Sequence, residues 1–167
     1  MNFKLEKISE LSGNKTAIYS VILKNEEQSL FERFLAENQS TYRTELNNIL
    51  QRLVAIGHDV GARAQFFKLE EGTPGDMVCA LYDDPDSKLR LYGMRFGMTT
   101  IILGGGGPKS KKIRAWQQDE KLSKHAKEMI AVSKQIYDRI KEKDIKWASN
   151  ELDLEGDLTF NEEDENE

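Results

Sequence analysis

Four short apolar segments, separated by turns of only a few residues, constrain the fold of this chain more than any other feature. They are Ala64–Leu69, Met77–Tyr82, Lys88–Phe96 and Thr99–Leu103. Each is rich in apolar, β-branched or aromatic residues, and Gly, Pro, Asp and Ser mark the turns between them. Parallel strands need a crossover of a dozen residues or more, so strands joined this closely pair antiparallel. The sequence therefore predicts an antiparallel meander.

One strand and two helices are predicted before the meander. The β-branched run Thr16–Lys24 is typical of a strand. Apolar residues at helical spacing predict a first helix over Ser29–Asn38. A second helix is predicted to begin after a cap at Ser40 or Thr41 and to end at Gly57. Because so few residues join them, we expect these two helices to form an antiparallel hairpin.

A third helix and an acidic tail are predicted after the meander. The helix is expected over Ser123–Lys143. Its expected apolar face consists of Ala126, Met129, Ile130, Ser133, Ile136, Tyr137 and Ile140. Weak alternation predicts an ordered stretch near Leu152–Phe160, and the composition after Asn161 predicts disorder. We expect a single domain over residues 1–148 and an acidic, partly disordered tail over residues 149–167.

Charge is distributed unevenly along the chain, although the net charge is only −5. The segment Lys88–Ala148 carries 15 Lys or Arg against six Asp or Glu. The segment Glu151–Glu167 carries nine acidic residues and no basic one. A basic body with an acidic tail is typical of a nucleic-acid-binding protein whose surface is partly masked by its own chain. The alternative is a solvated helix face followed by a disordered tail.

Composition excludes several classes of protein. No apolar run approaches the roughly 20 residues that a membrane-spanning helix needs. Cys79 is the single cysteine, so a disulfide framework within one chain is impossible. The first ten residues lack the uncharged apolar core of a signal peptide. We therefore expect a cytoplasmic protein without membrane partners.

The glycine run Gly104–Gly107 does not match a phosphate-binding loop, because Pro108 separates it from Lys109 and removes a backbone donor. The run is expected to form a sharp exit from the sheet, a flexible turn or a close approach to a ligand. His58 and His125 have no Cys or carboxylate at ligand spacing, so no metal site is predicted. We expect His125 to be solvated.

The strongest group of chemically active residues is basic. Arg90 and Arg95 are five residues apart on one predicted strand, and this spacing places them on opposite faces. Further cations on neighbouring segments are Lys68, Lys109, Lys111, Lys112 and Arg114. If the sheet brings them together, they would bind a polyanion and stabilise the phosphorane formed when a ribose 2′-hydroxyl attacks a phosphate. Tyr92 and Lys109 are candidates for proton transfer. The alternative is a basic surface that binds nucleic acid without cutting it.

A strand, a helical hairpin and a meander ending in a basic loop together resemble the RelE/ParE toxin superfamily. The RelE- and HigB-like branch of toxin–antitoxin systems is the nearer comparison. The resemblance covers about Ala17–Lys134. Its best local evidence is KLRLYGMRFGMTTIILGGGGPKSKK, which looks like the last two strands and basic loop of that family, and DMVCALYDD resembles the preceding strand.

The resemblance implies an α+β fold, in which an N-terminal strand and two-helix hairpin pack on a small twisted antiparallel sheet, with an added C-terminal helix and acidic tail. It implies mRNA cleavage, usually on the ribosome, without a metal or other cofactor. By this resemblance Arg90 would bind phosphate, Lys109 and Lys112 would be the basic residues after the last strand, Lys68 would be a looser match, and Tyr92 or Trp116 would stack on a base. The expected catalytic residues are Arg90, Tyr92, Lys109 and Lys112. The expected RNA-binding residues are Lys68, Arg95, Lys111, Arg114 and Trp116.

The resemblance also implies a partner, a small helix-turn-helix antitoxin. The third helix and the acidic tail exceed the usual length of these toxins, and the tail is expected to fold back on the basic face or to contact a partner. Two other functions remain open. One is a ParE-like protein that inhibits a topoisomerase, and the other is a regulator that binds RNA or the ribosome without cleavage.

Overall fold

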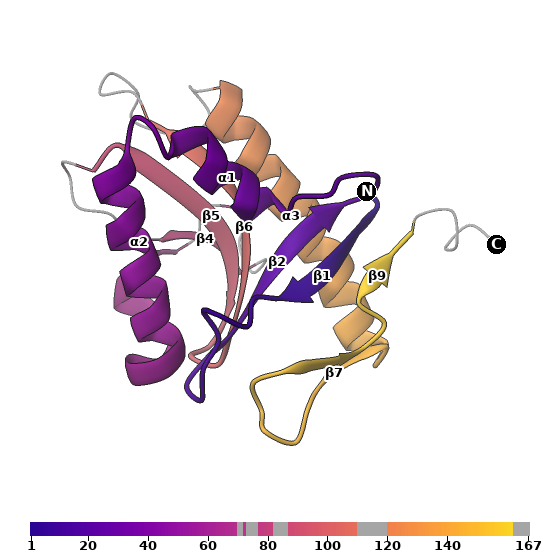
Figure 1. Cartoon of the computed structure of the whole chain (residues 1–167). Helices are drawn as coiled ribbons and strands as arrows, with labels where there is room; N and C mark the ends of the chain where they lie inside the picture. The colour runs from indigo at the N-terminus through magenta and orange to yellow at the C-terminus, as the bar shows by residue number, and fades with distance from the viewer. Residues whose placement is uncertain (70–71, 73–76, 82–86, 110–119, 162–167) are drawn as a thin grey trace.

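A mixed sheet forms the centre of the computed structural model, which describes residues 1–69, 72, 77–81, 87–109 and 120–161 (Figure 1). Its strand order is β3-β4-β5-β6-β2-β1-β9. The strands are β1 (Phe3–Lys7), β2 (Ala17–Leu23), β3 (Phe67–Lys68), β4 (Val78–Leu81), β5 (Leu89–Phe96), β6 (Thr100–Pro108) and β9 (Thr159–Phe160).

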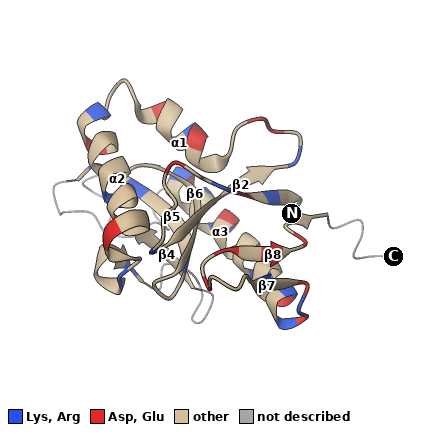
Figure 2. Cartoon of the chain, turned by 60° about the horizontal axis from the view of Figure 1, so that its bottom comes forward, with Lys and Arg blue, Asp and Glu red and all other residues tan. Residues whose placement is uncertain are grey.

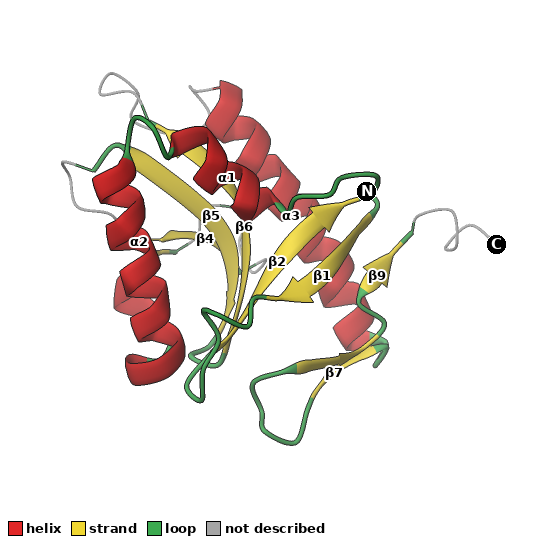
Figure 3. Cartoon of the chain, viewed as in Figure 1, coloured by secondary structure: helices red, strands yellow, loops and turns green. Residues whose placement is uncertain are grey.

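Helices cover both faces of this sheet (Figure 3). On one face, α1 (Leu30–Asn38) and α2 (Arg43–Ala55) form a buried cluster with inward residues of the sheet such as Leu91 and Ile101. On the other face, α3 (Glu120–Lys141) packs on the residues next to these, Tyr92 and Ile102. Successive strand residues point to opposite faces, so the two clusters lie on either side of the sheet. The expected α+β class is confirmed.

The sheet was expected to be antiparallel throughout, but one of its strand pairs is parallel. The strands β2 and β6 pair parallel, with Ala17 opposite Thr100 and Ser20 opposite Leu103. Both α1 and α2, together with β3, β4 and β5, lie between these two strands in the chain. This long crossover permits the parallel pairing that a short turn forbids. Each other strand pair in the described part of this sheet is antiparallel.

The predicted meander is confirmed over β4, β5 and β6, which pair antiparallel in sequence order. The prediction for its first strand was only partly right. Residues Ala64–Phe66 form a short 3-10 helix, and β3 has just two residues. The strand β1, which had not been predicted, alternates buried Phe3 and Leu5 with exposed neighbours and pairs with β2.

The first helix begins as predicted, because Ser29 forms a capping box with Glu32. The prediction for α2 was wrong at both ends. Its N-cap is Tyr42, which makes no side-chain cap, and the helical path continues beyond Gly57 as a π turn that ends at Gly61. In Figure 1, α2 turns away from the direction of α1. The two helices therefore do not form the expected antiparallel hairpin. Both pack apolar side chains on the same face of the sheet.

The predicted third helix is confirmed, and Ala126, Met129, Ser133 and Ile136 are buried as expected. Tyr137, which had been placed on the buried face, is instead 50% exposed. The spacing of apolar residues shows which side of the helix faces the core but not how wide the buried strip is. A residue at the margin of that strip, such as Tyr137, can therefore be exposed.

The C-terminal segment joins the main fold. The strands β7 (Ile145–Trp147) and β8 (Leu154–Gly156) form a hairpin, and β9 then pairs with β1. Phe160 is fully buried and stacks on Phe3 with ring centroids 4.3 Å apart. The Leu154 N–H donates to the Tyr19 hydroxyl over 2.9 Å, and burial raises the pKa of that hydroxyl above its ordinary value. Order over Leu152–Phe160 is confirmed, whereas the expected disorder concerns residues outside the described ranges.

The four glycines lie inside β6 and not in a turn, contrary to expectation. A side chain at Gly104 would overlap the Met129 thioether, and one at Gly105 would lie 2.5 Å from the His125 ring. A side chain at Gly106 would overlap the Arg90 carbonyl oxygen of β5. The pairing of β5 and β6 shifts register at this point. The run therefore allows both a helix and a neighbouring strand to approach the backbone of β6 closely.

We predict unequal effects of alanine at two neighbouring glycines. Gly106→Ala should lower the free energy of unfolding by about 3 kcal/mol or more, because the new methyl group meets backbone that cannot move away. Gly107→Ala should cost less than about 1 kcal/mol, because its methyl group meets only the end of the Lys121 side chain, 3.3 Å away. Urea denaturation of both variants measures the difference. Equal losses would contradict this account of the glycine run.

Candidate nucleic-acid interface

Arg90 lies at the start of β5, directly opposite Gly107 of β6. It shares the α3 face of the sheet with Tyr92 and Met94, whose side chains are buried beneath that helix. The arginine side chain itself is half-buried. Gly107 has no side chain, so the residue of β6 opposite Arg90 adds none to this face of the sheet. Arg90 is therefore a fixed cation at the end of the central strands.

Lys121, which the sequence had not singled out, lies next to the same glycine. Its ammonium nitrogen is 3.6 Å from the position that a Gly107 Cβ would occupy. It also forms an ion pair with Glu37 at the end of α1, with Lys121 Nζ 2.7 Å from Glu37 Oε2. The sequence does contain a signal for this contact. Lys121 and His125 are one helical turn apart and so share a face of the helix, and Gly105 and Gly107 are two residues apart and so share a face of the strand.

Lys109 and Lys68 extend this basic group along the sheet. Lys109 follows β6, and its backbone N–H donates to the Lys88 carbonyl over 2.8 Å, so it lies beside the start of β5. Lys68 is exposed on β3 and pairs with Ala80, which pairs with Tyr92. Cross-strand partners share a face, so Lys68 lies on the α3 face, as Arg90 does. Three of the predicted cations thus belong to one face or end of the sheet.

Arg95 points to the other face, as its spacing from Arg90 predicts. Its Nε donates to the Ala62 carbonyl over 2.7 Å, and the side chain is half-buried there. The guanidinium therefore holds the loop that follows the π turn. The prediction that Arg95 binds RNA together with Arg90 does not fit this position, because the sheet separates the two.

Tyr92 is fully buried, with 0% of its surface exposed, in the cluster beneath α3. It therefore cannot stack on a base or reach a scissile phosphate in this structure. The prediction failed because helices cover both faces of the central strands, so that a strand aromatic becomes core. Four other predicted residues lie outside the described ranges. They are Lys111, Lys112, Arg114 and Trp116.

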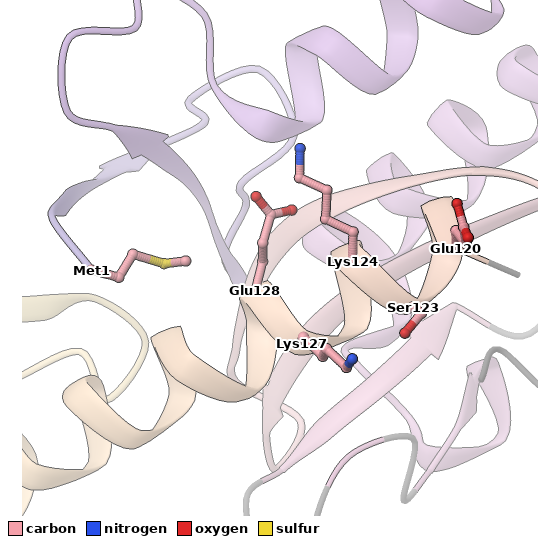
Figure 4. Close-up of a pocket in the computed structure, with 6 residues that line it drawn as sticks. All are labelled: Met1, Glu120, Ser123, Lys124, Lys127 and Glu128. Carbon is pink, nitrogen blue, oxygen red and sulfur yellow. The ribbon is translucent and has the colours of Figure 1, made fainter.

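His125 and Glu128 form a side-chain pair that was not predicted from the sequence. The His125 Nδ1 lies 2.9 Å from Glu128 Oε1, and each side chain is only 12% exposed. The expectation that His125 is solvated was wrong, because its ring packs over Gly105. Glu128 also lines an open pocket with Met1, Ser123 and Lys124 (Figure 4). A histidine fixed by a carboxylate next to Lys121 is suited to proton transfer.

The acidic residues of the described C-terminal segment make their ion pairs elsewhere. Asp153 pairs with Lys7 over 2.8 Å, and Asp157 pairs with Arg139 over 3.3 Å. Figure 2 shows acidic residues along β8, beside the C-terminal half of α3. These residues therefore neutralise β1 and the end of α3, far along the helix from Lys121.

Comparisons with known proteins give no match: no family model, no curated protein and no solved structure is similar to this chain. Among the described residues, no group of three His, Cys, Asp or Glu side chains is placed to hold a metal ion. In the same ranges, no helix combines the length and apolar composition that a membrane span requires.

We predict that Arg95 supports the fold and not the binding of a polyanion. Arg95→Ala should lower the free energy of unfolding by about 1–3 kcal/mol, because it leaves the Ala62 carbonyl without its donor. Affinity for a single-stranded RNA should change by less than about threefold, since the lost charge is on the covered face. Urea denaturation and fluorescence anisotropy measure the two effects. A tenfold loss of affinity at unchanged stability would return Arg95 to the binding surface.

Proposed function

We propose that this chain is a toxin-like endoribonuclease of the RelE/HigB kind, which cleaves mRNA in association with the ribosome. The observation that carries the proposal is the grouping of Arg90, Lys109 and Lys121 around the glycine end of β6. Three cations on a rigid sheet end and a helix N-terminal turn suit a phosphodiester. The RelE-like arrangement of the sheet and a helix-turn-helix antitoxin partner belong to the same proposal.

The proposed reaction is an attack of a ribose 2′-hydroxyl on the adjacent phosphorus, with departure of the 5′-oxygen of the next nucleotide. The guanidinium and ammonium groups stabilise the extra negative charge of the phosphorane. A general base removes the 2′-hydroxyl proton, and a general acid protonates the leaving oxygen. With Tyr92 buried, we assign proton transfer to His125, oriented by Glu128. The step needs no co-reactant beyond the RNA.

The burial of Tyr92 also favours a second function, in which the same basic surface binds RNA or the ribosome without cleavage. It removes one of the two residues first expected to move protons. A ParE-like action on a topoisomerase has no observation of its own in the described residues. Cleavage assays decide between the first two functions.

Arg90→Ala is predicted to lower the rate of mRNA cleavage by about 10²–10³-fold, because it removes a group that stabilises transition-state charge. Its effect on RNA affinity should be smaller, below about tenfold. The measurement is primer extension on a defined mRNA with and without translating ribosomes. Arg33→Ala is the matched control, since Arg33 pairs with Glu26 outside the proposed site. Equal losses of binding and cleavage would indicate electrostatic attachment alone.

His125→Ala is predicted to lower cleavage by about 10²–10⁴-fold and to change the shape of the pH–rate profile. His125→Gln keeps a polar side chain of comparable volume over Gly105 and should fold as the wild type does, while remaining inactive. Cleavage at single-turnover RNA concentrations across pH 5–9 provides the measurement. An active His125→Gln variant with an unchanged profile would show that His125 supports packing only.

A further inference from the structure

Tyr137 lies in an exposed stripe of lysines along α3. Its side chain is 50% exposed, and Lys127, Lys134 and Lys141 are exposed on the same side of the helix. A spacing of seven residues brings each lysine back to within about 20° of the previous one. It also separates successive lysines by about 10 Å along the helix. The stripe therefore presents cations at regular intervals beside an aromatic ring.

The opposite side of α3 faces the β1–β9 edge of the sheet. Gln135 Nε2 donates to the Met1 carbonyl over 3.1 Å, and Arg139 Nη1 donates to the Asp157 carbonyl over 2.9 Å. Tyr137 is two residues from each of them, and two residues correspond to about 200° around a helix. The Tyr137 side of α3 therefore faces the β4–β3 edge, where Lys68 is exposed on the α3 face of the sheet. Lys127 also lines the open pocket of Met1 and Glu128, and in Figure 4 its side chain leaves α3 in a different direction from that of Glu128.

The three lysines of this stripe form no ion pair with any described residue, in contrast to Lys121 with Glu37. Asp138, which is exposed between Lys134 and Lys141, forms no ion pair with either of them. On α3 itself, Ile130 is partly buried, and at the β4–β3 edge Leu69 and Met77 are 47% and 42% exposed. The α3 side of this surface thus combines positive charge that is unpaired among the described residues with one exposed aromatic ring.

We propose that this side of α3 is a binding surface for single-stranded RNA, separate from the phosphate site at Arg90. The lysines contact phosphates and Tyr137 stacks on a base, which is the combination that single-strand-binding proteins use. An acidic helix from a protein partner fits less well, because on α3 one ring and Ile130 offer too little apolar area for its buried face. The inference deepens the proposed function, since it assigns this surface to the same RNA substrate.

The test is fluorescence anisotropy with a labelled 12-nucleotide oligouridine carrying 2′-O-methyl groups, which cannot be cleaved by 2′-hydroxyl attack. Tyr137→Ala should weaken binding by about fivefold to 100-fold, as expected for the loss of one stacked base. Tyr137→Phe should bind within about twofold of wild type, because the ring is retained. Val54→Ala is the matched control, since Val54 is 40% exposed on α2, on the other face of the sheet.

Salt dependence tests the lysines independently. Replacement of Lys127, Lys134 and Lys141 by Gln should reduce the slope of log affinity against log salt by about 2, as expected for three single-strand phosphate contacts. Polyglutamate serves as the competitor for an acidic protein partner. The proposal would be overturned if folded Tyr137→Ala bound the oligonucleotide as wild type does. It would also be overturned if polyglutamate competed as well as RNA and its binding depended on Tyr137 in the same way. The oligonucleotide cannot be cleaved, so its binding is measured independently of the cleavage of mRNA. Binding that depends on Tyr137 in a protein that does not cleave mRNA would refute the proposed endoribonuclease activity and leave the binding surface standing.

Discussion

The close approach of α3 to the glycine run of β6 is the contact on which both the core and the candidate site depend. Side chains of the helix occupy the space where side chains of Gly104 and Gly105 would lie. A larger residue at these positions would lift the helix from the sheet and expose the buried Tyr92. It would also move Lys121 and His125 away from Arg90. Packing and proposed chemistry therefore place the same requirement on β6.

Much of the secondary structure could be predicted from sequence, because its signals are local. The capping box at Ser29 involves residues only three positions apart, and the buried apolar residues of α3 recur every three or four positions up to Ile136. The pairing of β2 with β6 and of β1 with β9 joins residues that are distant in the chain. No local pattern specifies such partners, so the parallel pair and the pairing of the C-terminal strand with β1 could not be predicted from the sequence.

The candidate site was predictable only in part. Strand alternation is enough to place Arg90 and Arg95 on opposite faces, but not to show that Arg95 is used internally to hold Ala62. Tyr92 looked accessible because the polar and apolar residues of β5 do not separate cleanly. The contacts of His125 depend on which strand lies beneath its helix, and tertiary packing decides this, not the local sequence. The glycine run, whose role the sequence leaves open, marks the close approach of a helix and of a neighbouring strand.

A sheet covered by helices on both faces leaves only its strand ends and edges for a large ligand. The placement of the cations follows this geometry. Arg90 and Lys109 lie where β5 begins and β6 ends, and Lys68 lies on an edge strand. Tyr137 is 50% exposed on the side of α3 that is turned away from the β1–β9 edge. An RNA strand that followed the outer side of α3 to its N-terminal turn would meet these groups in order. In the proposed function, the covered sheet would direct RNA binding to the helix flank and phosphate chemistry to the strand ends.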